Sequence, residues 1–377
     1  MPIAITLRSL AATAALALGL APAVLAGEAP RHIFYVMMEN HAYGEIIGNT
    51  DDAPYINALA AHAGQATQYF GVTHPSLPNY LAAMSGDFQG LWDDCKAGVT
   101  ILCAPEEFVA DSGDATASAS LTAQQIANAS STPHWFAGLN IVDQLEPAGL
   151  SWRAYFQSMP EGGYDVEYAP VVNNTVVKLY AQKHNPFLYF SDIRNSAGRL
   201  ANIVPFEQHF AQDLKSHHVP NFVFIAPDQC HDMHGMSPSS AALVGFPPCG
   251  YPASGLDHGA IQLGDQFLRD TVEAIRHSWA WRHESSAIVI VWDEDDYAGY
   301  AGCCGSPTGQ DGVLLGGAHV PMMVLLSGHE HARAHGVSKP ANHYSLLATI
   351  QHLWNLDCLG QTCPLREKQL LTRLFEN

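Results

Sequence analysis

Short apolar runs rich in β-branched and aromatic residues recur along the chain. Four of these runs are apolar at almost every position rather than at alternate ones: 32–38, 222–226, 287–292 and 320–326. Continuous apolarity is typical of strands that are buried on both faces of a parallel or mixed sheet. Helix-like segments lie between the runs, at about 54–63, 78–84, 205–216, 264–278 and 343–354. Strands that alternate with helices predict an α/β fold.

The other segments indicate how the chain is organised. Residues 1–26 are expected to be a signal peptide, because Arg8 precedes an Ala/Leu-rich stretch and the small residue Ala26 stands at the cleavage point. A membrane anchor is the rival interpretation of this stretch. Residues 27–377 are then predicted to form a single domain. Within it, the small and polar residues of 108–133 are expected to make a low-complexity surface insertion.

All eight cysteines lie after residue 26, and an even number in an exported chain favours disulfides over free thiols. Short spacings predict the pairs Cys95–Cys103 and Cys358–Cys363. The remaining four can pair in several ways, which the sequence leaves open: Cys230, Cys249, Cys303 and Cys304. Because no C-x-x-C pair occurs, a cysteine-type zinc site is not expected.

Acidic and amide side chains follow three of the predicted buried strands. These residues are Glu39, Asn40, Asp228, Asp232, Asp293 and Glu294. Ligands of open α/β sheets bind outside the carboxyl ends of the strands, so we expect the three groups to meet at one edge. Carboxylates gathered there would repel one another, and a divalent cation is the natural compensating partner. The competing interpretation is that each acid caps the helix or turn that follows it.

A candidate nucleophile lies in the octapeptide THPSLPNY at 73–80. Pro78 followed by an apolar run indicates a helix start, with Ser76 at or just before the N-cap. A hydroxyl there lies in positive potential among free backbone N–H groups, which favours phosphate binding. A nearby divalent cation would favour the alkoxide and make Ser76 a nucleophile. Ordinary helix capping is the alternative role for this side chain.

Composition narrows the classes of function. The chain has 377 residues, with 17 Lys and Arg against 36 Asp and Glu, and its formal net charge is -19 with neutral histidines. Such acidity argues against a nucleic-acid-binding protein, because phosphate backbones are bound mainly by Lys and Arg. The 20 histidines outnumber these cations. This excess favours metal or proton chemistry.

Several segments, in order over nearly the whole chain, resemble a known family. The matching stretches are MMENH at 37–41, THPSLPNYLAAMSGD at 73–87, QLEPAGLSWRAYFQSMP at 144–160, PNFVFIAPDQCHDMHG at 220–235, GDQFL at 264–268, IVIVWDEDD at 288–296, GGAHVP at 316–321 and NHYSLLATIQHLWNL at 342–356. The chain resembles the phosphoesterase family of bacterial and fungal acid phosphatases and related phospholipases C, within the alkaline-phosphatase superfamily. The resemblance implies a three-layer sandwich, in which helices cover both faces of a mostly parallel central sheet.

The resemblance also implies roles for single residues. It makes Ser76 the nucleophile, with Thr73 as the runner-up. The implied metal ligands after the first and late strands are Glu39, Asn40, Asp293 and Glu294. Some relatives carry Asp-His or two aspartates after the late strand, and the difference here favours one metal or an oxygen-preferring cation. The other matching residues are Asp228, Asp232 and His234 in the central cluster, and the late histidines His319 and His343, which would face the phosphate.

We therefore predict an exported enzyme, periplasmic or secreted, that hydrolyses phosphate monoesters through a phosphoserine. One or two divalent ions (Zn, Ca, Mg or Mn) would be bound by the acidic cluster, with Asp228 and Asp232 included, and would activate the serine. The expected substrates are small-molecule or lipid-headgroup phosphate esters.

Polar groups around the serine complete this hypothesis. Asn79 and the helix N-terminus would hold the phosphoryl oxygens. A histidine, with His74, His234 and His319 as candidates, would protonate the leaving group. Because a protonated histidine is most abundant in mild acid, an acidic pH optimum is expected.

Three rival functions remain open. A phospholipase C or other phosphodiesterase would use the same site on a larger leaving group. A non-catalytic exported protein that binds a metal or a glycan would use the carboxylates only to hold a structural cation. A Ser-His-Asp esterase would need no metal. The chain has no basic or amphipathic membrane-binding stretch, which favours monoesters over phospholipid diesters.

Overall fold

The predicted apolar runs are strands of one large sheet. The computed structural model describes residue 1 and residues 29–106, 121–252, 257–296, 299–329 and 335–376. Residues 2–26 of the predicted signal peptide and residues 108–120 of the predicted insertion lie outside these ranges. Within them, no helix is long and apolar enough to cross a membrane.

Eight strands form the central sheet, in the order β11-β2-β10-β9-β1-β8-β4-β7. Their bounds are β1 His32–Met38, β2 Gly64–Ala66, β4 Trp152–Phe156, β7 Ile203–Pro205, β8 Phe222–Ala226, β9 Ser286–Trp292, β10 Met322–Leu326 and β11 His335–Val337. Among these eight, only β10 runs against the others, because it pairs antiparallel with both β9 and β2. The sheet is therefore mostly parallel, as expected.

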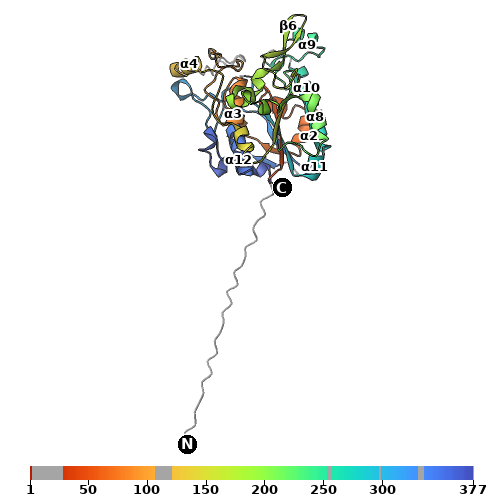
Figure 1. Ribbon diagram of the computed structural model, residues 1–377, viewed down its shortest axis with the longest axis vertical. Helices are drawn as coiled ribbons and strands as arrows, with labels where there is room; N and C mark the ends of the chain where they lie inside the picture. Colours follow the sequence, from red (N-terminus) through yellow and green to blue (C-terminus); the bar gives the residue numbers. More distant parts are fainter. Residues whose placement is uncertain (2–28, 107–120, 253–256, 297–298, 330–334, 377) are drawn as a thin grey trace.

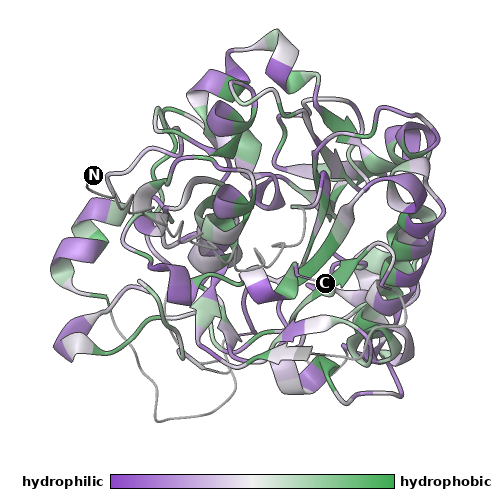
Figure 2. Ribbon diagram, turned by 90° about the horizontal axis from the view of Figure 1, so that it is seen from below, coloured by the Kyte–Doolittle hydropathy of each residue, from purple (hydrophilic) through white to green (hydrophobic). Residues whose placement is uncertain are grey.

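Helices cover both faces of this sheet. Figure 1 shows α3 and α12 on one side and α2, α8, α10 and α11 on the other, and Figure 2 shows hydrophobic strands between the two helical layers. The helices are α1 Tyr43–Ile46, α2 Pro54–Ala60, α3 Ser76–Ser85, α4 Ala123–Ala129, α5 Ile141–Leu145, α6 Ser191–Arg194, α7 Ala197–Leu200, α8 Phe206–Leu214, α9 Pro238–Leu243, α10 His258–Arg276, α11 Trp279–His283 and α12 His343–Leu353. The predicted α/β fold with three layers is confirmed.

The longest helix illustrates why these segments pack as they do. In α10 the buried apolar residues Ile261, Leu268, Val272 and Ile275 recur at helical spacing, so they form one stripe. This stripe joins the core that also contains the central strands. Gln262, Gln266, Arg269 and Asp270 of the same helix are exposed, whereas the carboxylate of Asp265 is buried and accepts from backbone N–H groups of α2.

Helix α3 has a sharply defined start and end. It begins at Ser76, directly after Pro75, and every residue of it is buried. Its C-cap is Gly86, which has a φ of 71°. A Cβ at Gly86 would lie 2.3 Å from the Leu359 carbonyl oxygen, so both the left-handed backbone and the close packing require glycine. Fixing both ends in this way fixes the place of Ser76.

Some elements were not predicted. Strand β4 lies within the sheet, yet its apolar pattern is interrupted by Arg153, whose guanidinium is bound to Asp213 at 2.8 Å. A separate hairpin, β5 Tyr168–Val172 and β6 Thr175–Ala181, also went unpredicted. Two short strands, β3 Tyr69–Phe70 and β12 Ala341–Asn342, pair with each other. In the described part of the low-complexity insertion, Thr122 caps the short helix α4.

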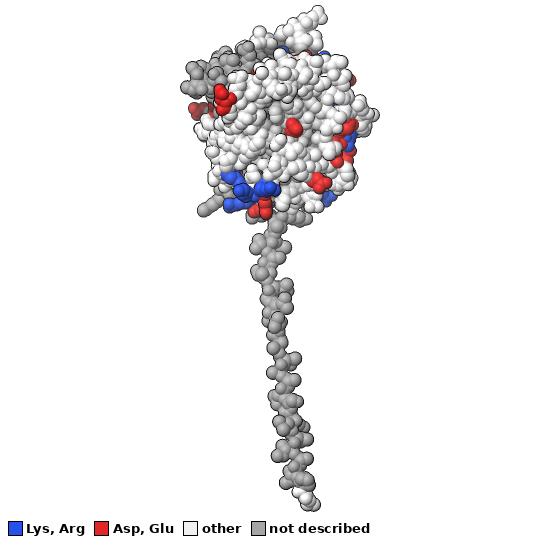
Figure 3. Space-filling view, turned by 90° about the vertical axis from the view of Figure 1, so that its left-hand side faces the viewer, with Lys and Arg blue, Asp and Glu red and all other residues white. Residues whose placement is uncertain are grey.

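Disulfides and charge complete the description. All eight cysteines are paired, which confirms Cys95–Cys103 and Cys358–Cys363. The pairs that the sequence left open are Cys230–Cys249 and Cys303–Cys304. On the face seen in Figure 3, charged side chains are sparse, and most of those visible gather in a few groups. Charged residues make up only 14% of the chain, which agrees with this view.

Candidate active site

Two acidic turns lie side by side because β1 and β9 are parallel neighbours. Glu39 follows β1, and Asp293, which follows β9, donates its backbone N–H to the Met38 carbonyl at 3.0 Å. The loop after β8 reaches the same place, since the Glu39 N–H donates to the Asp232 carbonyl at 2.8 Å. The carboxylates of Glu39, Asp232, Asp293 and Glu294 are all buried. The structure thus brings acidic residues from three strand ends to one edge of the sheet.

Ser76 lies against two of these carboxylates. Its Oγ is 3.0 Å from Glu39 Oε2 and 3.1 Å from Glu294 Oε1, so the hydroxyl proton can pass to either. The hydroxyl of Thr73, by contrast, lies 3.5 Å from the neighbouring His74 carbonyl. Of the two candidate nucleophiles, Ser76 is therefore the one in contact with the acidic cluster.

A buried lysine that sequence reasoning missed also contacts Ser76. Lys183 lies in the 3-10 helix η1 Gln182–His184, directly after β6, and its Nζ is 3.3 Å from Ser76 Oγ. The same amine binds Asp94 Oδ2 at 2.6 Å and donates to His234 Nε2 at 3.1 Å. Burial alone would lower the pKa of Lys183, but the nearby carboxylates of Asp94 and Glu39 raise it above its usual value. The amine is therefore a fixed cation beside the hydroxyl.

The next residue, His184, is the second one missed. Its Nε2 is 3.1 Å from Glu39 Oε1, and its Nδ1 is 3.1 Å from Asp232 Oδ2. The ring is stacked on Tyr80 of α3, with centroids 5.1 Å apart. Burial and the charge of Lys183 hold the pKa of His184 well below its usual value. A neutral imidazole is the form that binds metals.

The residues present fit a divalent cation. Within the described residues, five buried atoms at this edge make no hydrogen bond of regular geometry, although His184 lies 3.1 Å from both Glu39 and Asp232: Glu39 Oε1, Asn40 Oδ1, His184 Nε2, Asp232 Oδ2 and Asp293 Oδ2. Ligand atoms of Glu39, His184 and Asp232 all lie within 4.8 Å of one another. Buried oxygens without a partner carry a large free-energy cost, which a bound cation would offset. Carboxylate, amide and imidazole ligands suit Zn, Mn, Mg or Ca.

The pKa values of the carboxylates lead to the same conclusion. Burial raises the pKa of Glu39 from 4.5 to about 7. Burial, followed by repulsion from Glu39, raises the pKa of Asp232, Asp293 and Glu294 well above their usual values. Both causes act against the charged form of each acid. A cation among them would restore the charged form.

Two of the predicted catalytic histidines lie at the site, but not as protonated acids. His74 Nδ1 is bound to Glu294 Oε2, and its Nε2 lies 3.0 Å from the Gly299 carbonyl. His234 Nδ1 lies 3.0 Å from the Gly235 carbonyl, so Nε2 is free to accept from Lys183. Burial, the largest cause for both, lowers the pKa of His74 and holds that of His234 well below its usual value. The expectation of an acidic optimum therefore gains no support from these two rings.

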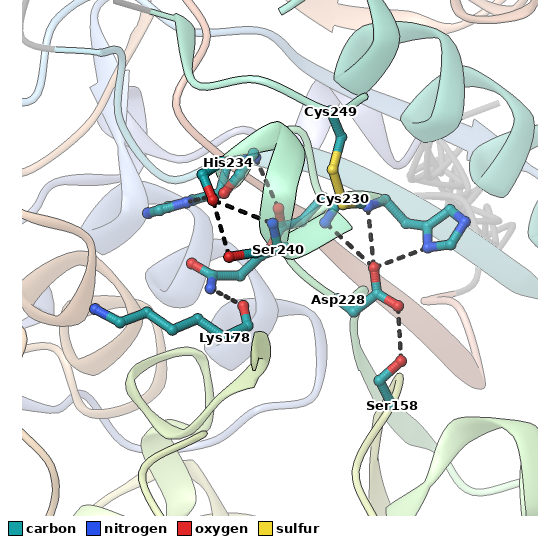
Figure 4. The surroundings of a disulfide bond; sticks show 12 residues. Ser158, Lys178, Asp228, Cys230, His234, Ser240 and Cys249 are labelled. Carbon is teal, nitrogen blue, oxygen red and sulfur yellow. Dashed lines mark hydrogen bonds and ion pairs between the residues drawn. A yellow bond between two sulfur atoms is a disulfide. The ribbon is translucent and has the colours of Figure 1, made fainter. Parts of the chain in front are cut away.

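Asp228, a predicted metal ligand, has protein partners at both carboxylate oxygens. Its Oδ1 accepts from the backbone N–H groups of Cys230 and His231 at 3.2 Å and lies 2.8 Å from His231 Nδ1. Its Oδ2 accepts from the Ser158 hydroxyl at 2.7 Å. Figure 4 shows these contacts beside the Cys230–Cys249 disulfide. All of them hold the turn after β8, which is the capping role that was the competing interpretation.

The side chain of Asn79 is hydrogen-bonded to the backbone of its own segment. Its Oδ1 accepts from the N–H groups of Val72 and Thr73 at 2.7 and 3.2 Å, and its amide donates to two carbonyls in the same segment. Gly71 allows that segment to pass close to the site, because a Cβ there would lie 2.7 Å from the Asp293 carbonyl. Asn79 therefore holds the chain that leads to Ser76, and its polar atoms are taken.

The late histidines, His319 and His343, contact backbone carbonyls around the acidic cluster. His343 Nε2 is 2.7 Å from the Asp293 carbonyl, and its Nδ1 is 3.1 Å from the Tyr69 hydroxyl. His319 is stacked on Tyr43, with its Nε2 3.1 Å from the Thr67 carbonyl. These contacts support the backbone around the site, and no contact found among the described residues joins either ring to Ser76.

With this geometry in view, the comparisons with known proteins identify the family. A sequence model of the Phosphoesterase family matches residues 49–244 and 251–357, and the chain belongs to that family. It is similar to a probable acid phosphatase from Kluyveromyces lactis, at 26% identity over 336 residues, covering 89% of this chain and 61% of the relative. It is also similar to a phosphatidylinositol-3-phosphatase from Mycobacterium tuberculosis, at 26% identity over 332 residues, which cover 87% of this chain and 78% of that relative.

The chain spans about three fifths of the length of the Kluyveromyces lactis relative. Among solved structures, it resembles a protein of the alkaline phosphatase superfamily from Vibrio parahaemolyticus, with a TM-score of 0.48 and 13% identity. That similarity covers 91% of this chain and 72% of the other.

Proposed function

We propose that this chain is an exported, metal-dependent phosphatase that hydrolyses phosphate monoesters through a phosphoserine at Ser76. The observation that carries the proposal is the place of the Ser76 hydroxyl, which lies between Glu39 and Glu294 and 3.3 Å from Lys183 Nζ. A hydroxyl with two proton acceptors and a cation at its side is arranged for attack on an anionic centre. Membership of the Phosphoesterase family supports the reaction class.

Each residue has a separate task in this proposal. Glu39, Asn40, Asp293 and Glu294 would hold the cation, with Asp232 and His184 as the further ligands that the unpartnered atoms indicate. A divalent cation bound there would neutralise the carboxylates, favour the serine alkoxide and polarise the phosphoryl oxygens. The contact of His74 with Glu294 orients that carboxylate toward Ser76.

Proton movement follows from the hydrogen bonds. The Ser76 proton passes to Glu39 or Glu294 as the Oγ attacks phosphorus and the ester oxygen leaves. The departing alkoxide then takes a proton from water, because His234 Nε2 accepts from Lys183 and its Nδ1 faces the Gly235 carbonyl. In the second half, water attacks the phosphoserine and phosphate departs, which regenerates the hydroxyl.

The relatives suggest the substrates. One is named a probable acid phosphatase and another a phosphatidylinositol-3-phosphatase, so soluble esters and lipid headgroups both belong in a substrate panel. Export to the periplasm or beyond agrees with four disulfides, which persist in oxidising compartments.

Phosphate release from an aryl phosphate tests the proposal. Purified protein should turn over the ester, lose activity on chelation and regain it when a divalent metal is added. Ser76→Ala should abolish turnover, whereas Ser85→Ala should retain it, because the contacts of the Ser85 hydroxyl are with Leu81, Asp87 and Gln89 at the far end of α3. Equal activity of Ser76→Ala and wild type would overturn the proposal, and activity that survives chelation would overturn its metal dependence.

A further inference from the structure

Lys183 is held so that all three of its N–H donors have partners. The ammonium group contacts Asp94 Oδ2 at 2.6 Å, His234 Nε2 at 3.1 Å and Ser76 Oγ at 3.3 Å. Its side chain is 8% exposed, so little water is available to replace any of these contacts. The third contact is directed at the atom to which the phosphoryl group would be attached.

Asp94 ties this lysine to the helix that carries the serine. Its Oδ1 accepts from the Leu77 backbone N–H at 2.9 Å, in the first turn of α3, while its Oδ2 binds Lys183. The carboxylate therefore fixes the distance between the ammonium group and Ser76. Because the Leu77 N–H is already occupied, the helix start offers one donor fewer to a phosphate than the sequence suggested.

The charge around Ser76 is otherwise negative. The described side chains in contact with its hydroxyl are Glu39, Glu294 and Lys183, of which only Lys183 is a cation. A phosphate monoester brings two negative charges on three unesterified oxygens, whereas a diester brings one charge on two such oxygens. A buried ammonium group pairs with the additional charged oxygen of the monoester. In a diester an alkoxy group replaces that oxygen, and the ammonium group is then poorly paired.

From these contacts we infer that Lys183 is the residue that makes the site select dianionic phosphate monoesters over diesters, and that Asp94 is its positioning residue. This inference rests on the proposed function and names the substrate class of the same site. Lys183 pairs with the charge that only the monoester carries. Asp94 holds the lysine amine within contact distance of the Ser76 hydroxyl. The preference is therefore set by charge rather than by the size of the leaving group.

The test compares two aryl esters with the same leaving group, p-nitrophenyl phosphate and bis(p-nitrophenyl) phosphate, on the metal-loaded protein. Lys183→Met should lower kcat/KM for the monoester about 100-fold, the loss typical of one transition-state charge partner, and that for the diester less than about fivefold. Lys178→Met is the matched control, because Lys178 is an exposed lysine on the same hairpin, with its Nζ over the Tyr168 ring. It should leave both values unchanged.

Asp94→Asn keeps the inference testable if Lys183→Met does not fold, which circular dichroism would show. This variant should lower the monoester-to-diester ratio about tenfold, with a raised KM and a raised inhibition constant for inorganic phosphate. Equal losses on the two esters in Lys183→Met overturn the inference, as does an unchanged ratio in Asp94→Asn or a wild type that prefers the diester. If one of these results is found while the wild type is active and Ser76→Ala is inactive, the proposed function stands and only the role of Lys183 fails.

Discussion

Acidic turns follow three neighbouring strands of the same sheet, β9, β1 and β8, yet their carboxylates differ in their partners. Asp228, after β8, has partners at both oxygens within its own turn and from Ser158. Glu39 and Asp293, after β1 and β9, are equally buried, but each has an oxygen that makes no regular hydrogen bond among the described residues. The contacts of the Asp228 carboxylate hold its turn, whereas the other two carboxylates have oxygens that the proposed cation could bind. We interpret the difference as one between a structural acid and two acids of the proposed site.

This contrast has a physical basis in the cost of burial. A buried carboxylate without partners is unfavourable, and the fold tolerates it only where the rest of the structure provides the stability. Asp228 helps to hold its turn, so its removal costs stability. Burial of Glu39 and Asp293 raises the energy of the metal-free protein, and if they bind the proposed cation their removal should cost activity rather than stability.

The largest expected effect is on catalysis at the unsatisfied pair. Asp293→Asn should lower kcat/KM for an aryl phosphate about a thousandfold, because it removes a charged ligand from the site that activates Ser76. Its free energy of unfolding in chelator should be unchanged or higher, because a repelling charge is lost. Steady-state kinetics and urea unfolding measure the two quantities. Loss of stability without loss of activity would make Asp293 a structural acid and remove the contrast.

The next effect is the pH dependence of the metal-free protein. Glu39 has a folded pKa of about 7, raised from 4.5, so the folded state binds more protons than the unfolded state between these values. Its contribution to stability therefore falls as pH rises from about 5 through about 7. Urea unfolding in chelator should show this loss, and an added divalent cation should restore stability most at the upper end. Glu39→Gln should flatten the curve, and a slope that persists unchanged in this variant would contradict the assignment.

Asp228→Asn should act mainly on stability. The neutral amide oxygen can still accept from the N–H groups, but more weakly than a carboxylate, and an NH2 group replaces the oxygen that accepts from Ser158, which should cost about 2 kcal/mol of unfolding free energy. Activity per folded molecule should stay within about threefold of wild type, since none of the Asp228 contacts reaches Ser76. Unfolding in urea and kinetics at low temperature check the two parts. A loss of activity as large as that of Asp293→Asn would place Asp228 in the metal site after all.

The smallest effect is expected from Ser158→Ala, which removes one hydrogen bond to Asp228. It should cost about 1 kcal/mol of unfolding free energy and leave kinetics unchanged. In combination with Asp228→Asn it should cost less than the sum of the two, since the variants share one contact. Full additivity in this double-mutant cycle would show that the contact contributes nothing.

The sequence predicted half of the strands of the central sheet and part of the site. Continuous apolar runs identified four of the eight strands, and the acids at their ends identified Glu39 and Asp293 as neighbours. The resemblance then identified Ser76, which does contact the acids. Strand β4 was missed because Arg153 breaks its apolar pattern, and a side chain that reaches out to Asp213 cannot be told from a loop cation in the sequence.

Other features depended on the fold and could not be predicted. Asp228 and Asp293 both follow a buried strand, and only the course of the following loop decides whether that loop uses the carboxylate. Lys183 and His184 enter the site from a hairpin whose residues are partly exposed, so no apolar pattern marked them. A lysine within the largely apolar segment 179–190, in a chain poor in cations, was the one signal available.

Acid-quenched phosphorylation of the protein tests the central claim most directly. Metal-loaded wild type is mixed with a ³²P-labelled monoester, quenched within the first turnover and digested, and the labelled peptide is sequenced by mass spectrometry. We predict label on Ser76, formed and lost at rates consistent with turnover, and no label in Ser76→Ala. Label on Thr73 or on a histidine, or full turnover by Ser76→Ala, would contradict the assignment of Ser76 as the nucleophile of this site.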